Sequence, residues 1–342
     1  MIILLSPGYD SLLLMRQSKR NLRRTLCDEQ NGFATRLLTW YDAHKRDLPW
    51  RKDRDPYRVW LSEIMLQQTR VAAVLDHYHR FLQKFPTVQK LAAARGASVL
   101  AAWSGLGYYR RARMLHAAAK QVVKEHGGAF PATSTELREL PGIGRYTAAA
   151  IASIAFDEPV AVVDGNVERV VQRVLGKRIT GQEVWQTAGA GLDARRPGDF
   201  NQAMMELGAT VCLPRQPRCL LCPVADGCAT RGELPTAGVA PRQRKREICF
   251  GLARRNASVF LVQRKKEESL MAGMWELPEI VPSRAKPMWS LRHSITVTDY
   301  AVRVIEIASP NGAAGRWIPF QRLESLPLTG LARKILRRAA IL

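Results

Sequence analysis

Four cysteines gathered in one short segment limit most tightly how this chain can fold. They are Cys212, Cys219, Cys222 and Cys228, separated by gaps of six, two and five residues. Four thiolates on one compact loop can close a tetrahedral zinc site or hold the corners of a cubane iron–sulfur cluster. Zinc sites more often contain two Cys-x2-Cys pairs, and this segment contains one. The spacing therefore predicts a site with a structural role, because four ligands leave no open position, and it leaves an iron–sulfur cluster, zinc or four unliganded thiols as alternatives.

The charge of the chain indicates an anionic partner. Its 342 residues include 52 Lys and Arg against 30 Asp and Glu, a net charge of +22. Such an excess is typical of proteins that bind nucleic acid, an acidic partner or an anionic membrane surface. The apolar stretch near the N-terminus is interrupted by Pro7, Gly8 and Asp10, so it is too short to cross a membrane. Its basic residues follow the apolar ones, which is the reverse of a signal peptide, and we expect a cytoplasmic protein.

The length and the apolar patterning predict two domains. Up to about residue 211, apolar side chains recur at helical spacing between Gly and Pro stops, which predicts a mainly α domain. Alternating apolar residues in the last hundred positions predict strands, followed by a helix, and hence a smaller α+β domain. The expected parts are an N-terminal extension over 1–30, a helical domain over 31–211, the cysteine loop over 212–230, a basic linker over 231–246 and the α+β domain over 247–342.

A glycine turn followed by an acid indicates contact with DNA. Gly142 and Gly144 form a tight turn before an Ala-rich helix, and the backbone N–H groups of such a turn can bind a phosphate. Asp164 lies twenty residues beyond Gly144, at the end of an apolar run and before another predicted helix. By itself, Asp164 fits the N-cap of that helix equally well.

Together, the turn, the acid and the cysteine loop resemble the helix-hairpin-helix superfamily of base excision DNA glycosylases, which includes endonuclease III. Residues 60–69 (WLSEIMLQQT) resemble the catalytic segment of one branch, the MutY family, nearly residue for residue, and residues 48–51, 105–109 and 200–208 also match it. The resemblance covers about residues 33–230. It implies a two-lobed α catalytic domain with a [4Fe–4S] cluster on the four cysteines. It also implies that the chain removes adenine from double-stranded DNA where adenine lies opposite 8-oxoguanine or guanine.

The resemblance assigns catalytic roles to two carboxylates. Glu63 is the general acid that protonates adenine and then activates water, and Asp164 stabilises the sugar cation. Tyr146 and Asn166 orient these carboxylates through hydrogen bonds. From the residues alone, the apolar neighbours of Glu63 predict a raised carboxyl pKa, as a general acid needs.

Further positions are implied to contact the DNA. The target base must leave the duplex and enter a pocket. By resemblance, Trp50, Arg51 and Glu206 contact the flipped adenine, and Gln68 and Tyr108 enter the gap or face the partner base. Core packing is the alternative for Tyr108.

The chain lacks the lysine of the bifunctional relatives. Those enzymes cut the backbone through a Schiff base on a lysine, and this chain has Tyr146 at that place, with no lysine between Lys124 and Lys177. We therefore expect a monofunctional enzyme. The alternatives are an endonuclease III-like glycosylase/lyase acting on oxidised pyrimidines and a catalytically silent DNA-binding relative.

The C-terminal domain resembles the Nudix-like domain with which MutY enzymes recognise 8-oxoguanine. Residues 259–264 and 273–278 match its opening, but the row of glutamates that a Nudix hydrolase needs for magnesium is missing, so recognition is expected. Many family members have Phe-Ser-His where this chain has Ile295, Thr296 and Val297. Thr296 keeps a hydroxyl that could bind the lesion, and an ordinary strand threonine is the alternative. We expect a monomer associated with the bacterial nucleoid.

Overall fold

The computed structural model describes residues 32–234, 244–265, 267–268, 271–281, 286–295, 298–310 and 312–342. The chain forms two compact units, Met1–Glu63 with Phe130–Ala237 and Ile64–Ala129 with Gly238–Leu342. The boundary at Glu63 falls inside one continuous helix, α3 (Pro56–Leu66). This division groups residues 64–129 with the C-terminal strands, and no local pattern in the sequence indicates that grouping. The domain boundaries expected from the sequence stay predictions.

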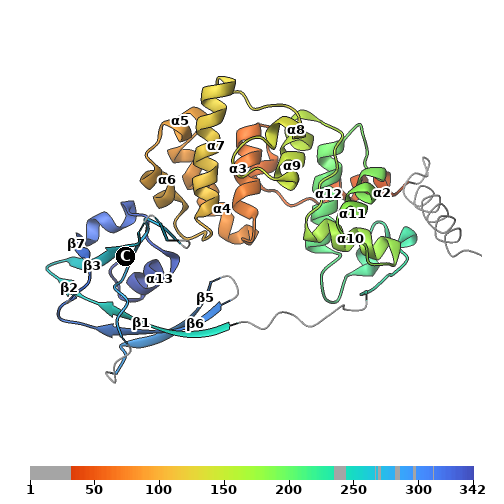
Figure 1. The fold of residues 1–342 in the computed structure, drawn as a ribbon. Helices are drawn as coiled ribbons and strands as arrows, with labels where there is room; N and C mark the ends of the chain where they lie inside the picture. Colours follow the sequence, from red (N-terminus) through yellow and green to blue (C-terminus); the bar gives the residue numbers. More distant parts are fainter. Residues whose placement is uncertain are drawn as a thin grey trace, which may run out of the picture. The chain divides into compact units, whose positions relative to one another are not determined.

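The first unit is helical (Figure 1). Its core joins residues that recur at helical spacing on separate helices, such as Leu37, Val170, Phe200 and Met204. Helix α12 is central because it packs against α2, α9 and α10. Besides the N-terminal part of α3, the helices of this unit are α2 (Phe33–His44), α8 (Ser134–Leu137), α9 (Arg145–Phe156), α10 (Gly165–Leu175), α11 (Gln182–Ala190) and α12 (Pro197–Thr210), with 3-10 turns η1 (Pro49–Arg51), η2 (Cys219–Leu221) and η3 (Ala225–Gly227).

Close approach of α12 to its neighbours depends on two glycines. A Cβ atom on Gly198 would lie 2.6 Å from the carbonyl oxygen of Ser153 in α9, and one on Gly208 would lie 2.6 Å from Cβ of Asn166 in α10. Both distances are too short for a real contact, so any side chain would push α12 away. The glycines therefore allow α12 to pack closely against the last turn of α9 and the first turn of α10.

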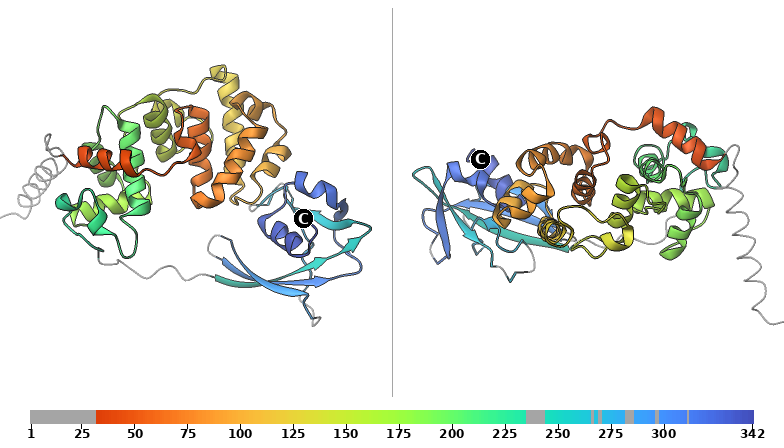
Figure 2. Two further views of the ribbon diagram at one scale, coloured as in Figure 1. Left: turned by 180° about the vertical axis from the view of Figure 1, so that it is seen from behind. Right: turned by 90° about the horizontal axis from the view of Figure 1, so that it is seen from above.

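The second unit contains four helices before residue 130, a fifth near the C-terminus, and all the strands of the described chain (Figures 1 and 2). The first four helices are α4 (Val71–Lys84), α5 (Val88–Ala93), α6 (Gly96–Trp103) and α7 (Arg110–His126). The strands are β1 (Arg244–Leu252), β2 (Arg254–Arg255), β3 (Ser258–Gln263), β4 (Trp275–Glu276), β5 (Trp289–Ile295), β6 (Thr298–Glu306) and β7 (Gly315–Pro319), followed by η4 (Phe320–Ser325) and α13 (Gly330–Arg338).

Two sheets and α13 enclose the C-terminal core. One sheet has the order β1-β6-β5, with β1 parallel and β5 antiparallel to β6, and the other joins β2, β3 and β4, with β7 also paired to β3. Leu331, Ile335 and Leu336 of α13 pack in one cluster with Phe250 and Val302 of the sheets. The expected class, a mainly α domain followed by a smaller α+β region, is confirmed.

One strand begins earlier in the chain than its composition suggests. Strand β1 begins at Arg244, inside the segment 231–246 that the sequence predicts as linker. Its first residues pair with the start of β6, with Lys245 opposite Asp299. This ladder extends the strand into a run that composition alone assigns to a loop.

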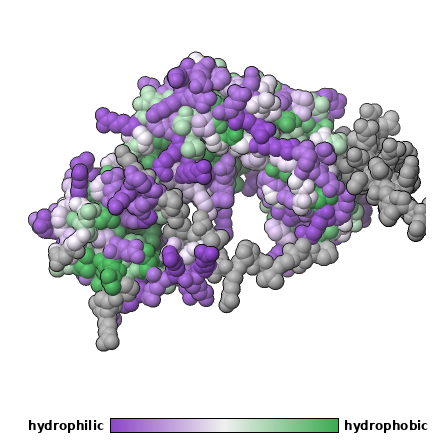
Figure 3. Space-filling view, in the orientation of Figure 1, coloured by the Kyte–Doolittle hydropathy of each residue, from purple (hydrophilic) through white to green (hydrophobic). Residues whose placement is uncertain are grey.

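None of the helices among the described residues is both long and apolar enough to cross a membrane. In the view of Figure 3, hydrophilic side chains cover much of the described surface, as the 52 Lys and Arg residues lead one to expect.

Candidate active site

Glu63 is a buried carboxyl on α3. Its exposed fraction is 7%, and its neighbours Leu61, Ile64 and Met65 are 0–4% exposed. Burial raises the pKa of Glu63 to about 7, the Tyr146 hydroxyl and the charge of Arg51 oppose the rise, and the charge of Asp164 adds to it. The raised pKa that the sequence predicts is therefore found, and a carboxyl with this pKa can hold a proton at neutral pH.

Tyr146 reaches Glu63 from the first turn of α9. Its hydroxyl donates a 2.6 Å hydrogen bond to Oε2 of Glu63 and lies 3.4 Å from Sδ of Met205. Burial and the charge of Glu63 raise the pKa of Tyr146 well above its ordinary value, so the phenol stays protonated and acts as a donor.

The glycine turn that precedes α9 has free space beside its backbone at Gly144. Gly142 has a φ of +77°, a left-handed conformation that favours glycine. Gly144 is the N-cap of α9, and a Cβ atom built on it would meet nothing within 4 Å. Space beside this helix N-terminus suits the approach of an anionic group.

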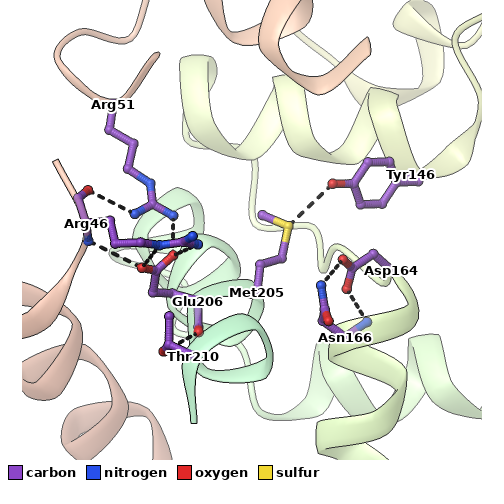
Figure 4. Close-up of polar contacts among 8 residues, drawn as sticks. All are labelled: Arg46, Arg51, Tyr146, Asp164, Asn166, Met205, Glu206 and Thr210. Carbon is purple, nitrogen blue, oxygen red and sulfur yellow. Dashed lines mark hydrogen bonds and ion pairs between the residues drawn. The ribbon is translucent and has the colours of Figure 1, made fainter. Parts of the chain in front are cut away.

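Asp164 caps α10 and is held by Asn166. Its Oδ1 accepts hydrogen bonds from the backbone N–H groups of Asn166 (2.9 Å) and Val167 (2.7 Å). Its Oδ2 accepts a 2.9 Å hydrogen bond from the side-chain amide of Asn166. The N-cap interpretation is thus confirmed, and the predicted pairing of Asn166 with Asp164 is present beside it (Figure 4).

Glu206 forms a second buried acidic position, on α12, and is 1% exposed. Arg46 donates to both of its carboxylate oxygens, at 2.6 and 2.8 Å, and Arg51 donates to Oε2 at 2.8 Å (Figure 4). Burial would raise the pKa of Glu206, but the hydrogen bonds and charges of Arg46 and Arg51 lower it, so this carboxylate is ionised. Trp50 is buried beside Arg51 in η1.

Arg46 was missed from the sequence. The only local signal was its position just before the Leu48–Arg51 match, in a chain already rich in arginine. Its partner lies 160 residues away, so no pattern of neighbouring residues could indicate the pair.

The four cysteines line one pocket together with Arg173 and Arg231. The pocket holds about 320 Å³ of empty space, including open solvent at its mouth. Arg173 donates a 3.3 Å hydrogen bond to Sγ of Cys212. Burial and the neighbouring thiols raise the pKa of Cys222 to about 11.

The donor set suits either a zinc ion or a four-iron cluster, because four thiol groups line one pocket. Within the described ranges, no three His, Cys, Asp or Glu residues are grouped closely enough to hold one metal ion. A zinc ion would draw all four sulfurs to about 2.3 Å from a single point, whereas a four-iron cluster would bind each thiolate to a different iron.

Gln68 and Tyr108 lie in the second unit, each in an exposed turn. Their φ angles are +57° and +47°, unusual for residues other than glycine. Tyr108 is 46% exposed, so the core-packing alternative for it is wrong. Thr296 lies outside the described residues.

Comparisons with known proteins agree with this geometry. The model of the HhH-GPD superfamily of base excision DNA repair proteins matches residues 61–187. The chain is 53% identical over 212 residues to the adenine DNA glycosylase of Rattus norvegicus, covering 58% of this chain and 41% of that protein. It is 42% identical over 312 residues to the enzyme of Mus musculus, covering 73% of this chain and 60% of that protein. The chain is similar to the MutY family of adenine DNA glycosylases.

Two solved DNA glycosylase structures share the fold of the helical part of this chain. A thermostable thymine-DNA glycosylase is 28% identical, with a TM-score of 0.56, over 63% of this chain and 98% of its own. An endonuclease III in a non-covalent DNA complex is 23% identical, with a TM-score of 0.51, over 58% of this chain and 92% of its own, and shows the fold alone. The chain spans about 41% to 60% of the length of the rat and mouse relatives it matches.

Proposed function

We propose that this chain is an adenine DNA glycosylase that hydrolyses the N-glycosidic bond of adenine opposite 8-oxoguanine or guanine in double-stranded DNA. One observation carries the proposal: a buried glutamate with a pKa near 7, bound to Tyr146 and close enough to Asp164 to feel its charge. A carboxyl near neutrality beside an anionic carboxylate is the arrangement that acid-catalysed glycoside cleavage requires.

The proposed mechanism assigns a separate task to each carboxyl group. Glu63 gives its proton to nitrogen 7 of the flipped adenine, and the glycosidic bond then breaks with its electron pair leaving on the base. Asp164 stabilises the oxocarbenium-like sugar cation through its negative charge. Glu63, now ionised, accepts a proton from the water that attacks the sugar carbon, which regenerates the acid. Tyr146 and Asn166 keep the two carboxyl groups oriented through their hydrogen bonds.

Residues beside this pair are proposed to hold the substrate. Trp50, Arg51 and Glu206 would contact the adenine, and the ion pair that Arg51 makes with Glu206 would fix both groups before the base arrives. Gly142 and Gly144 would bind a phosphate through backbone N–H groups. Gln68 and Tyr108 would occupy the space that the base leaves.

The four cysteines would hold a [4Fe–4S] cluster, which supplies a covalent tie across residues 212–228 of the loop when bound. Arg173 donates to Cys212 beside that position, so a protein hydrogen bond supports one of the thiolates. The resemblance of the C-terminal strands to a Nudix-like recognition domain, the role of Thr296, a monomeric state and a nucleoid location are retained as predictions.

The test is single-turnover cleavage of duplexes with one adenine opposite 8-oxoguanine, guanine or thymine, each scored with and without hot alkali. We expect alkali-dependent product, fastest opposite 8-oxoguanine, and none from Glu63→Gln. Trapping by borohydride would instead support the lyase alternative. Absence of product on all three duplexes, from protein that contains its cluster, would overturn the proposal in favour of a silent DNA-binding protein.

A further inference from the structure

Two exposed turns of the second unit hold non-glycine residues in the left-handed backbone region. They are the turn after α3, with Gln68 at a φ of +57°, and the turn before α7, with Tyr108 at a φ of +47°. Such conformations cost free energy and persist only where surrounding contacts hold them. The contacts that hold these two turns therefore determine where the Gln68 and Tyr108 side chains are presented.

One side chain, Arg111 in the first turn of α7, contacts both turns. On the Gln68 side it donates hydrogen bonds to three carbonyl oxygens, those of Ile64 (2.7 Å), Met65 (3.0 Å) and Gln67 (2.5 Å), and to the Thr69 hydroxyl (3.3 Å). On the Tyr108 side it donates to the carbonyl oxygens of Leu106 (3.2 Å) and Gly107 (3.4 Å). Its bonds thus bracket Gln68 and reach the residues directly before Tyr108.

The guanidinium also lies against aromatic rings. It is 5.5 Å from the ring centroid of Tyr108 and 5.4 Å from that of Trp103. Trp103 in turn donates a 3.1 Å hydrogen bond to the carbonyl oxygen of Gly107, an acceptor that it shares with Arg111. Arg111 therefore holds Tyr108 in two ways, through hydrogen bonds to the backbone just before it and through contact with its aromatic ring.

Among the ion pairs and hydrogen bonds described for Arg111, none is made with a carboxylate. Its positive charge therefore faces carbonyl oxygens and aromatic rings. The guanidinium is partly buried, and this burial lowers the pKa of Arg111 to about 10. Ile64 and Met65 belong to the last turn of α3, whose carbonyl groups have no partner within the helix, and a cation there also opposes the negative end of the helix dipole. A lysine has three donors at one point and could not span both turns.

We propose that Arg111 is a positioning residue that holds Gln68 and Tyr108 as one rigid element, which enters the duplex when adenine is flipped out. This rests on the proposed function, because it assigns Gln68 and Tyr108 to the DNA. Arg111 itself faces carbonyl groups and aromatic rings, so it acts through these two residues.

The first measurement is single-turnover adenine excision opposite 8-oxoguanine by Arg111→Lys and Arg111→Met. Arg110→Met is the matched control, since it removes the same charge from the same helix turn at an exposed position. We expect at least a tenfold loss of rate for Arg111→Met, a smaller loss for Arg111→Lys and less than a threefold change for Arg110→Met. Equal rates for the Arg111 and Arg110 variants would overturn the inference. If Arg111→Met does not fold, Arg111→Lys carries the comparison.

A double-mutant cycle separates positioning from general destabilisation. If Arg111 acts through Gln68, then Arg111→Lys combined with Gln68→Ala will be no slower than the slower single variant. If the losses multiply, Arg111 acts independently of Gln68, and the inference is wrong. Tyr108→Ala provides the same cycle for the other turn.

A readout that needs no excision distinguishes this inference from the proposed function. The adenine is replaced by 2-aminopurine, whose fluorescence rises when it unstacks. We expect the rise with the unsubstituted chain and with Arg110→Met, and at most a third of it with Arg111→Met or Arg111→Lys. If the unsubstituted chain excises no adenine, the proposed function falls, and this comparison alone decides the role of Arg111. If the unsubstituted chain also raises no fluorescence, both the proposed function and the role of Arg111 are wrong.

Discussion

The Tyr146 hydroxyl donates a 2.6 Å hydrogen bond to Oε2 of Glu63, and this contact opposes the effect of burial on the same carboxyl. Burial favours the neutral acid, whereas a hydrogen bond donated to the carboxylate favours the ionised form. The resulting pKa of about 7 leaves Glu63 partly protonated at neutral pH. A carboxyl group in this state can give a proton in one step and take one back in the next.

Substitution of Tyr146 by Phe removes the contact that lowers the Glu63 pKa. Because Glu63 must be protonated to act as the acid, the excision rate of the unsubstituted enzyme should fall as pH rises through about 7. In Tyr146→Phe the midpoint of that fall should move upward by about one to two pH units, since a hydrogen bond to a charged group contributes about 1.5–3 kcal/mol. Rates from pH 5 to 9 check this. Tyr109→Phe, which removes a hydroxyl that donates to the Leu328 carbonyl, should keep the original midpoint.

Glu63→Gln should stabilise the protein at high pH while abolishing excision. The folded-state pKa of Glu63 is raised, so the folded protein binds the proton more tightly than the unfolded chain. The protein is therefore most stable, relative to the Gln variant, below the unfolded pKa of about 4.3, and loses that stability as pH rises through about 7.

At pH 8 the Gln variant should be more stable by up to about 3 kcal/mol, the free energy of a shift of about 2.5 pKa units. Its amide oxygen can still accept the Tyr146 hydrogen bond. Chemical denaturation of both proteins at pH 5 and pH 8 measures the difference, and a constant gap between them would contradict the assigned pKa.

Asp164 has two separable tasks, and an amide should preserve one of them. Asn is as good an N-cap as Asp, so Asp164→Asn should lose less than about 1 kcal/mol of stability. It loses the charge that stabilises the sugar cation, and excision should fall by a factor of roughly a thousand or more. Thr133→Ala is the control, because it removes the capping box of α8 and should cost about 1 kcal/mol with excision retained. If Asp164→Asn and Thr133→Ala lost excision to a similar extent, the role of Asp164 would be limited to capping α10.

If the four cysteines hold an iron–sulfur cluster, the iron content of the protein should depend on each of their thiols. Protein isolated without oxygen should carry about four iron atoms per chain and the visible absorption of an iron–sulfur cluster. Cys222→Ser should lose most of both and melt at a lower temperature. Cys249→Ser alters a buried thiol of the second unit and should keep the iron. Zinc in place of iron would restore the alternative drawn from the sequence.

Local patterns in the sequence predicted much of the fold and part of the candidate site. Helical spacing predicted the mainly α region and alternation predicted strands in the last hundred residues, because both patterns depend on which neighbours along the chain share a face. The apolar neighbours of Glu63 predicted its raised pKa for the same reason. The start of β1 at Arg244 was not predicted, since the pairing with β6 overrides a composition typical of loops.

By itself, the sequence determined the helical class and the grouping of the four cysteines, since each depends on residues close together in the chain, and its resemblance to the MutY family pointed to the two carboxyl groups. Only the tertiary structure decided that Arg46 and Arg51 meet Glu206, and that Arg111 joins the turns of Gln68 and Tyr108. These contacts join residues up to 160 positions apart. Such contacts depend on how closely whole helices approach each other. Glycines such as Gly208 permit a close approach because they have no side chain. Such distances are properties of packing, and packing is settled only when the whole core is assembled.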